Sequence, residues 1–243
     1  MTEQPLDGKT LLITGAARRI GRLFALSCAQ AGGDIIIHHA HSDAEAQSLR
    51  IEIQRLDRQA WVFSADFSDS HQTRELIPQI NQSTPIHCLI NSAAIFEPHS
   101  MASTSLEDWN KHLTINLTAP FLLSQAFARQ AGTNARIVNV LDWRALRPGA
   151  DHFLYTISKS ALAAMTKSLA VALAPKITVN GLALGAILPP VDGNASPEEI
   201  VRNIPLRRWA GKGEIEQAMI FLLTCPQYIT GEIIHVDGGR HLI

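Results

Sequence analysis

The sequence is short of charge, of cysteine and of long apolar runs, and each shortage argues against a class of protein. Charged residues make up 18% of the 243 residues and the net charge is −1, so electrostatics does not favour nucleic acid or an anionic membrane as the main partner. The three cysteines are odd in number and widely spaced, which predicts reduced packing residues and not a disulfide framework. No apolar run approaches the roughly 18 residues of a membrane span, and no basic segment followed by an apolar one begins the chain. We therefore expect a soluble, cytoplasmic protein.

Histidine is plentiful, with ten residues, but its spacing does not predict a metal site. The pattern HExxH is missing, and His38, His39 and His41 have neither a cysteine nor a paired carboxylate at ligand spacing. We expect no bound metal.

What the chain does contain is an uninterrupted alternation of apolar runs and helical patterns. The runs are continuously apolar, which is typical of strands in a parallel sheet covered on both faces. The sequence thus predicts one doubly wound α/β domain over residues 1–243, with a parallel sheet of about seven strands and helices on both faces. The expected strands span 9–14, 34–38, 60–64, 87–91, 136–140, 177–180 and 231–236. The expected helices run from Ile20 to the Gly32-Gly33 pair, over 43–57, 70–82 and 105–131, around Tyr155, and over 213–224.

The turn after the first expected strand, TGAARRIG at 14–21, is a candidate phosphate loop. A glycine at the strand end lets the backbone approach a pyrophosphate, and the next helix offers unpaired N–H groups and the positive end of its dipole. The candidate cofactor residues here are Gly15, Arg18, Arg19, Ile20 and Gly21. The alternative is a glycine-bearing connection without a ligand.

The end of the second expected strand indicates which nucleotide would bind. An NAD site places a carboxylate there to grip the ribose hydroxyls, whereas this chain reads HHAHS at 38–42. Asp43 follows and is expected to cap the next helix. Arg18 and Arg19, with His41 and Ser42 opposite, suit a 2′-phosphate. We therefore predict NADPH over NADH.

Tyr155 and Lys159 are four residues apart on an expected helix, so both side chains share one face. An ammonium near a phenol favours the ionised form, so we expect a lowered pKa for Tyr155 and a role in proton transfer. The alternative is an amphipathic core tyrosine beside a solvated lysine.

The set of motifs, in this order, resembles the short-chain dehydrogenase/reductase family over essentially the whole chain. The resemblance rests on the turn 14–21, Asp66, Asn91-Ser92-Ala93, Asn116, Tyr155, Lys159, Asn180 and Asp237-Gly238-Gly239. It implies a Rossmann domain with NADPH or NADP as cofactor. Tyr155 would donate and accept the proton, Lys159 would bind the nicotinamide ribose and tune the tyrosine, and Asn116 would support a water relay. Further cofactor contacts are implied for Tyr155 itself and for Asp66, Phe67, Asn91, Ala93, Gly185 and Ile187.

Two departures from the general family pattern are informative. Arg19 stands where the loop usually has glycine, and Asp142 replaces the usual catalytic serine. With Phe96, five residues after Asn91, they resemble the pteridine reductase branch, as do HHAHSDAEA and the closing DGGRHL. The resemblance implies that Arg19, Phe96, Asp142 and Tyr155 contact the substrate, a pterin or folate.

Chemistry favours the same substrate. A serine hydroxyl donates to the developing alkoxide of a ketone, whereas an ionised aspartate would repel it. A pterin presents an amino group and ring nitrogens that need acceptors and protons. We therefore expect reduction of a dihydropterin C=N bond, with the Asp142/Tyr155 pair helping to protonate nitrogen and Phe96 stacking on the pterin.

Several alternatives remain open from the sequence. The enzyme could be a generic NADPH-dependent carbonyl reductase of the 3-oxoacyl type, or the chain could be a catalytically silent nucleotide sensor. Phe96 could be a core residue, Arg19 could serve the phosphates only, and Asp142 could cap a loop.

The expected substrate loop, about 185–212, carries Leu184-Gly185 where the family usually has Pro-Gly, so its path is open. Trp143, Arg144 and Trp209 are expected to border the substrate mouth, and His152 stands where some pteridine reductases have a substrate-facing aromatic. The helix beginning at Pro120 and the Tyr155 helix are apolar on more than one face. The resemblance therefore implies a homotetramer that pairs these helices.

Overall fold

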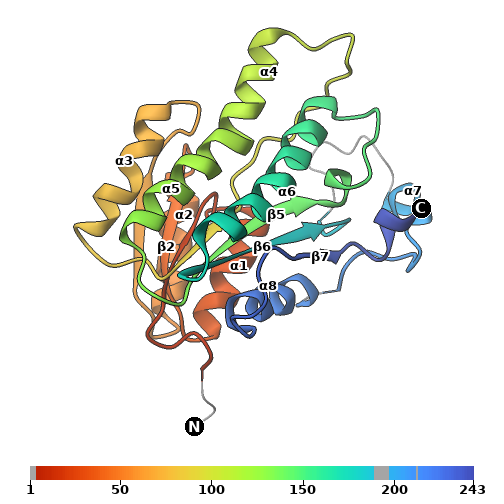
Figure 1. Ribbon diagram of the computed structural model, residues 1–243. Helices are drawn as coiled ribbons and strands as arrows, with labels where there is room; N and C mark the ends of the chain where they lie inside the picture. The colour runs from red at the N-terminus through yellow and green to blue at the C-terminus, as the bar shows by residue number, and fades with distance from the viewer. Residues whose placement is uncertain (1–3, 189–196, 212) are drawn as a thin grey trace.

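The sheet is parallel and has seven strands in the order β3-β2-β1-β4-β5-β6-β7. The computed structural model describes residues 4–188, 197–211 and 213–243 (Figure 1). The strands are β1 (Thr10–Ile13), β2 (Asp34–His39), β3 (Ala60–Ser64), β4 (Cys88–Asn91), β5 (Ala135–Asp142), β6 (Ile177–Leu184) and β7 (Ile233–Val236). Every residue of β1, β4 and β6 is buried, as expected for continuously apolar strands covered on both faces.

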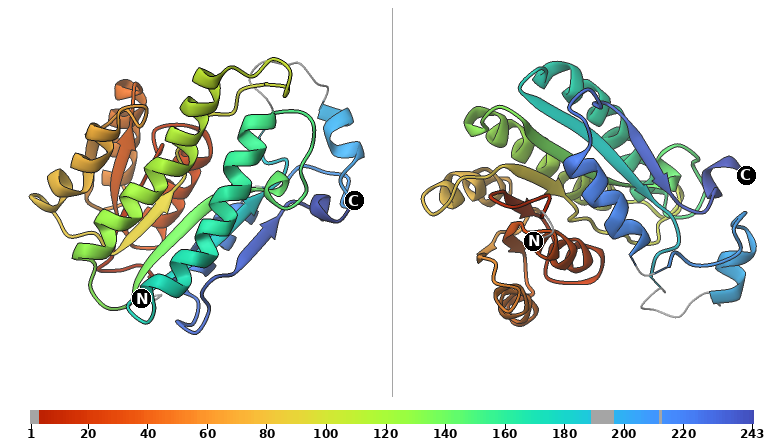
Figure 2. Two further views of the ribbon diagram at one scale, coloured as in Figure 1. Left: turned by 45° about the horizontal axis from the view of Figure 1, so that its top comes forward. Right: turned by 90° about the horizontal axis from the view of Figure 1, so that it is seen from below.

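Helices cover both faces of this sheet (Figure 2). One face carries α1 (Arg19–Gln30), α2 (Asp43–Gln54) and α8 (Glu214–Thr224). The other carries α3 (Ser70–Asn81), α5 (Ala119–Gln130) and α6 (Phe153–Leu173). The remaining helical segments are α4 (Leu106–Leu113), the π turn η1 (Thr114–Thr118), the 3-10 turns η2 (Trp143–Ala145) and η3 (Arg240–Leu242), and α7 (Pro197–Arg202). The predicted doubly wound α/β fold is confirmed.

The strand order places a crevice next to β1. The chain moves outward from β1 to β3 and then returns to β4 on the other side of β1, so Leu11 pairs with both Ile35 and Cys88. In open α/β sheets, ligands bind at the carboxyl ends of the strands where the order reverses. The turn after β1 and the segments after β2 and β4 therefore meet at one place.

Three local features differ from the sequence prediction. The helix expected over 105–131 is interrupted by the π turn η1, although α4 and α5 still follow one another in a single column (Figure 1). Asp43 was expected to cap α2, but it is the first helical residue and Ser42 precedes the helix. Strand β5 extends through Asp142, two residues beyond the predicted end, and this extension carries the carboxylate to the edge of the crevice.

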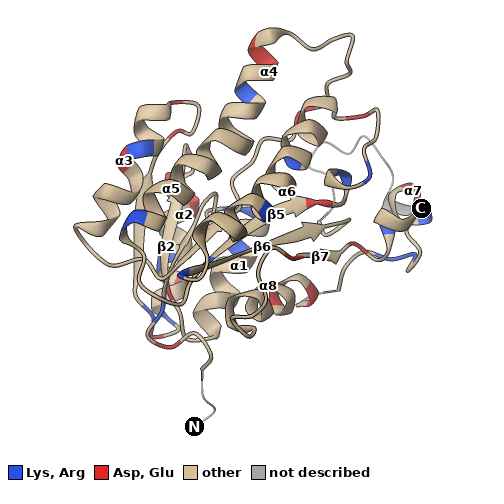
Figure 3. Ribbon diagram, in the orientation of Figure 1, with Lys and Arg blue, Asp and Glu red and all other residues tan. Residues whose placement is uncertain are grey.

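Charges of both signs are interspersed over the elements (Figure 3), in keeping with the net charge of −1. All three cysteines, Cys28, Cys88 and Cys225, are free and buried, which confirms their packing role. Burial raises the pKa of the Cys88 thiol to about 11, so it stays protonated.

Among the described residues, no helix is both long and apolar enough to cross a membrane. Part of the expected substrate loop, residues 189–196 and 212, lies outside the described residues.

Candidate active site

A cavity of about 570 Å³ opens at the crevice between β1 and β4. Within the described part of the chain its walls come from the turn after β1, the ends of β2 and β3, the segment after β4, and two residues of the α4–η1 region. The predicted cofactor residues that line it are Gly15, Arg18, Arg19, Ile20, Gly21, His41, Ser42, Asp66, Phe67 and Ala93.

The turn after β1 has the geometry of an anion-binding loop. Gly15 has φ +65°, and a Cβ on it would lie 2.9 Å from the Cα of Ala93, so a side chain does not fit there. Helix α1 begins at Arg19, and the preceding Arg18 makes no side-chain capping hydrogen bond to the first turn in the described structure. The N-terminus of α1, the positive end of the helix dipole, therefore faces the cavity without a side-chain cap from Arg18.

His38 holds this loop against the sheet, a role that the sequence did not indicate. Its Nδ1 accepts a hydrogen bond from the Gly15 N–H at 3.1 Å, and its Nε2 lies 3.0 Å from the Ala65 carbonyl oxygen. The ring stacks on Phe67 with centroids 4.1 Å apart. Burial lowers the pKa of His38 to about 4, so the neutral imidazole accepts at Nδ1 and donates at Nε2. His38 thus ties β1, β2 and β3 together beneath the cavity.

The side chains of Arg18, in the turn after β1, and of His41, just after β2, lie at the rim of the cavity. The Arg18 guanidinium is 66% exposed and lies 3.7 Å from Glu45, while His41 is 79% exposed with Nε2 3.2 Å from Asp66. Exposed pairs of this kind are weak, so a phosphate could compete with Glu45 for the Arg18 guanidinium and could accept a hydrogen bond from His41. Asp43 instead faces His39, at 3.6 Å. The cavity's size, its glycine turn and this cationic rim fit a dinucleotide that carries an additional phosphate.

Besides Tyr155 and Lys159, three predicted cofactor residues lie apart from these walls. The side chain of Asn91 is buried and donates to the Asn139 side chain at 2.8 Å, which in turn donates to Thr166 at 2.9 Å. Gly185 approaches Asp237 so closely that a Cβ would lie 2.5 Å from the Asp237 Cα. Ile187 packs against the apolar core on the α1 face. These contacts brace the strands that carry the site.

Asp142, Tyr155 and Lys159 meet at the carboxyl end of β5. The Tyr155 hydroxyl donates to Oδ2 of Asp142 at 3.4 Å. Oδ1 of Asp142 accepts from the Arg144 N–H at 2.9 Å, so one oxygen caps the turn η2 and the other faces the phenol. The Lys159 ammonium donates to the Val140 carbonyl at 2.7 Å and lies 5.7 Å from the centre of the Tyr155 ring.

The expected lowering of the Tyr155 pKa is wrong for this arrangement. Burial, together with the neighbouring Asp142 carboxylate, raises the pKa of Tyr155 well above its ordinary value. Burial also lowers the pKa of Lys159 to about 8 and raises that of Asp142, although the Arg144 N–H opposes the rise at Asp142. The sequence expectation included only the Lys159 ammonium. It did not include the burial of the Tyr155 phenol or the Asp142 carboxylate beside it. Tyr155 is therefore a neutral phenol that can donate a proton.

The π turn η1 places Asn116 inside the molecule, at 0% exposure. Its amide accepts from the Ile95 N–H at 2.9 Å and donates to the Ile95 carbonyl at 3.0 Å and to the Ser158 hydroxyl at 3.0 Å. Ser158 donates in turn to the Tyr155 carbonyl at 2.8 Å. Asn116 thereby connects the segment after β4 to α6, the helix that carries Tyr155 and Lys159. Ser158 was missed because a serine in a helix interior carries no distinctive sequence pattern.

Phe96 is half exposed and does not belong to the core, with 51% of its surface accessible. Its ring stacks on His152 at 3.9 Å and meets the edge of Tyr155 at 4.7 Å. The Arg144 guanidinium lies 5.7 Å from the Phe96 ring centre and 2.6 Å from Asp151. An aromatic face, a carboxylate, a phenol and a guanidinium are thus gathered at one end of α6.

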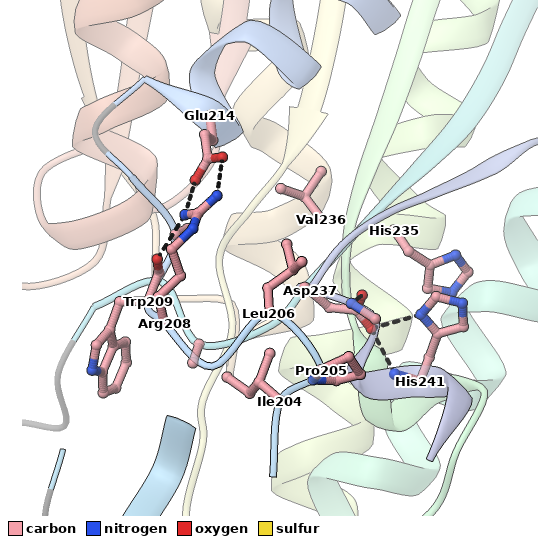
Figure 4. A pocket seen from close by; sticks show the side chains of 14 residues that line it. Ile204, Pro205, Leu206, Arg208, Trp209, Glu214, His235, Val236, Asp237 and His241 are labelled. Atoms are coloured by element: carbon pink, nitrogen blue, oxygen red, sulfur yellow. Dashed lines mark hydrogen bonds and ion pairs between the residues drawn. The ribbon is translucent and has the colours of Figure 1, made fainter. Parts of the chain in front are cut away.

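A second cavity, of about 490 Å³, lies between β7 and the segment that leads into α8 (Figure 4). Arg208 forms a bidentate ion pair with Glu214, and Asp237 accepts from the His241 N–H at 2.8 Å. Trp209, expected at the substrate mouth, lines this cavity. Trp143 is buried beneath the guanidinium of Arg240, at 4.3 Å.

The fold and the site define an oxidoreductase that binds a dinucleotide of the NADP type, and comparison with known proteins identifies the family. A family model described as enoyl-(acyl carrier protein) reductase matches residues 15–241. The chain is 30% identical over 240 residues to a 3-oxoacyl-[acyl-carrier-protein] reductase of Synechocystis sp., covering 96% of this chain and 97% of that protein.

Two solved structures are also similar along nearly the whole chain. FolM alternative dihydrofolate reductase 1 from Brucella canis, complexed with NADP, has a TM-score of 0.89 and 31% identity, covering 97% of this chain and 95% of that one. A blue fluorescent protein from a metagenomic library, in complex with NADPH, has a TM-score of 0.91 and 33% identity, covering 97% and 99%. The chain belongs to the short-chain dehydrogenase/reductase family, and the predicted cofactor, NADPH or NADP, is confirmed.

Proposed function

We propose that the protein reduces a dihydropterin or dihydrofolate with NADPH. One observation carries the proposal: Tyr155 has the Asp142 carboxylate 3.4 Å from its hydroxyl and the half-exposed ring of Phe96 4.7 Å from its own ring. A carboxylate repels a developing alkoxide but accepts hydrogen bonds from an amino group or a protonated ring nitrogen. An aromatic face next to such an acceptor suits a flat, nitrogen-rich heterocycle.

The cofactor would be held by the loop after β1 and the cationic rim. The uncapped N-terminus of α1 and Gly15 would receive the pyrophosphate, and Arg18, His41 and Ser42 would receive the 2′-phosphate. Arg19 lines the same cavity and would contact the pterin or the phosphates. When bound, NADPH supplies the hydride that reduces the C=N bond.

The remaining steps belong to residues of this chain. Tyr155, kept neutral by its raised pKa, donates a proton to the ring nitrogen. Asp142 accepts hydrogen bonds from the substrate's N–H groups, and burial raises the pKa of its carboxyl group. Lys159, anchored on Val140, would hold the nicotinamide ribose. His152 covers one face of Phe96, so the substrate would stack on the other face or displace the imidazole.

A second candidate is the reduction of a 3-oxoacyl thioester or another carbonyl. The Synechocystis relative, described as a 3-oxoacyl-[acyl-carrier-protein] reductase, favours it. Asp142, in place of a hydroxyl donor, weighs against it. The Brucella canis neighbour supports the pterin proposal, because its description is that of a dihydrofolate reductase.

Turnover of a small panel of substrates separates these candidates. The purified protein is assayed with dihydrobiopterin, dihydromonapterin, dihydrofolate and an acetoacetyl thioester, each with NADPH and with NADH. We expect kcat/KM to be highest for a dihydro substrate with NADPH. A preference for the thioester would move the assignment to the carbonyl reductase. Binding of NADPH without turnover of any substrate would indicate a nucleotide sensor, and equal or better use of NADH would refute the 2′-phosphate site.

We also propose that the protein self-associates as a homotetramer. Helices α5 and α6 expose apolar side chains on their outer faces, with Phe121 at 42% and Val171 at 83% accessibility. A second copy could cover these faces across a two-fold axis. Light scattering at micromolar concentration should give a mass of four chains. A Val171→Lys variant should lower that mass, whereas a monomeric wild-type protein would exclude the arrangement.

A further inference from the structure

Three potential metal ligands converge close to the chain segment that carries Phe96, apart from Asp142, Tyr155 and Lys159. They are Glu97 and His99, in the segment between β4 and α4, and His112 on α4. One ligand atom from each lies within 4.8 Å of the other two. The sequence gave no indication of this cluster, because thirteen positions separate His99 from His112. Short-range ligand motifs do not include such a spacing.

His112 is the most informative member of the cluster. Its side chain is 0% exposed, and its Nδ1 lies 3.0 Å from the backbone carbonyl of Asp108, one helical turn earlier. Because a carbonyl only accepts, Nδ1 carries the proton and Nε2 presents a lone pair. Among the described residues, that buried Nε2 has no hydrogen-bond partner. Metal-binding histidines commonly have this arrangement, with one ring nitrogen fixed by a carbonyl and the other left for the ion.

The other two ligands lie on the solvent side of His112. Nε2 of His99 is 3.7 Å from Oε2 of Glu97, and the rings of His99 and His112 meet edge to face at 5.4 Å. The side chains of Glu97 and His99 are 37% and 17% exposed, which leaves a route of entry. Ligand atoms bound to zinc at about 2.0–2.2 Å lie about 3.4 Å apart in a tetrahedron, so small side-chain rotations would close the site.

Two neighbouring charges affect the site. The Lys111 ammonium lies 2.7 Å from Oε1 of Glu97, and Oδ2 of Asp108 lies 4.0 Å from Nδ1 of His99. A cation bound between Glu97 and the histidines would compete with Lys111, while Asp108 would support the binding of His99.

We propose that Glu97, His99 and His112 form a binding site for a divalent transition-metal cation, with Zn²⁺ as the best match. Two imidazoles and one carboxylate are a common zinc ligand set that leaves a position for water. The site would stabilise the segment that presents Phe96. Glu97 follows Phe96 directly, and the His99 carbonyl accepts from the Phe153 N–H at 2.8 Å, at the start of α6. The ion therefore has a positioning role and no part in proton or hydride transfer.

The test is zinc binding to the full-length protein after treatment with a chelator. Isothermal titration should give one equivalent of Zn²⁺ per chain, and Zn²⁺ should raise the melting temperature because only the folded state presents the site. Co²⁺ serves as a spectroscopic probe, since its visible bands report nitrogen and oxygen ligands. Binding of NADPH, measured in parallel, shows that each variant is folded.

Three variants and one control assign the site. Glu97→Gln, His99→Ala and His112→Gln should each weaken binding at least about tenfold, the effect seen even for outer-shell changes. His71→Ala, at an exposed position on α3, should bind as the wild type does. If His112→Gln does not fold, the two partly exposed positions still decide the question. The proposal fails if the wild-type protein takes up no Zn²⁺ or if binding persists unchanged in Glu97→Gln and His99→Ala.

Discussion

Replacing Tyr155 by phenylalanine is expected to lower kcat for the dihydro substrate by about 10²–10⁴-fold, the usual contribution of a positioned proton donor. The variant keeps the ring that lies perpendicular to Phe96 and loses the hydroxyl that faces Asp142. The phenol is the group that the raised pKa keeps protonated. Because the ring remains, binding of substrate and of NADPH should change little, and the loss should appear in kcat.

The sequence offers a matched control for this variant, because it contains two tyrosines. Tyr228 lies on the surface, with full exposure of its side chain. Tyr228→Phe should leave kcat and KM at wild-type values. Steady-state rates and NADPH dissociation constants for both variants make the comparison. If Tyr155→Phe retained wild-type turnover of every candidate substrate, the protein would not use this phenol for proton transfer.

Sequence patterns were sufficient for the fold and for the placement of the loop after β1. Continuous apolar runs predict buried parallel strands, and the position of Gly15 between a strand and a helix predicts a turn without a side chain. Both follow from interactions that are local in the chain. Phe96 is half exposed and Asp142 lies opposite Tyr155, while their contacts with a substrate stay predictions.

Features that depend on contacts distant in the sequence could not be predicted in the same way. The pKa of Tyr155 depends on its burial and on a carboxylate from β5, so the spacing of Tyr155 and Lys159 gave the wrong direction. His38 supports Gly15 across 23 positions, and Asn116 reaches Ser158 across 42. The π turn that orients Asn116 contains about one residue more than a turn of α-helix. The spacing of apolar residues does not reveal such a local change.

Asp142 is the position at which the two candidate enzymes differ most, and three substitutions test its role. Asp142→Asn keeps the shape and removes the charge. Asp142→Ser introduces the hydroxyl donor expected of a carbonyl reductase. Asparagine and serine are both good capping residues, so the hydrogen bond to the Arg144 N–H should persist in each. Asp151→Asn removes the other carboxylate paired with Arg144 and serves as the control.

Stability should not confound this comparison. Burial raises the pKa of Asp142, so the folded state binds its proton more tightly than the unfolded state does. The carboxyl group therefore stabilises the fold most below its unfolded pKa, about 3.9, and this contribution is lost as the pH rises toward the folded value. At neutral pH the asparagine variant should melt at or above the wild-type temperature. A large drop in melting temperature would mean that the capping hydrogen bond had not been preserved.

The expected kinetic result is a change of substrate preference. Asp142→Asn should lower kcat/KM for the dihydropterin by about 10²-fold, because a group that accepts from the substrate and shares its proton is lost. Asp142→Ser should lose the same activity and gain reduction of the acetoacetyl thioester, since one donor to a developing oxyanion contributes about 10²–10³-fold. Asp151→Asn should behave as the wild type. An equal loss in Asp151→Asn would show that Asp142 acts through Arg144, and unchanged pterin turnover in both Asp142 variants would remove the basis for assigning a nitrogen heterocycle as the substrate.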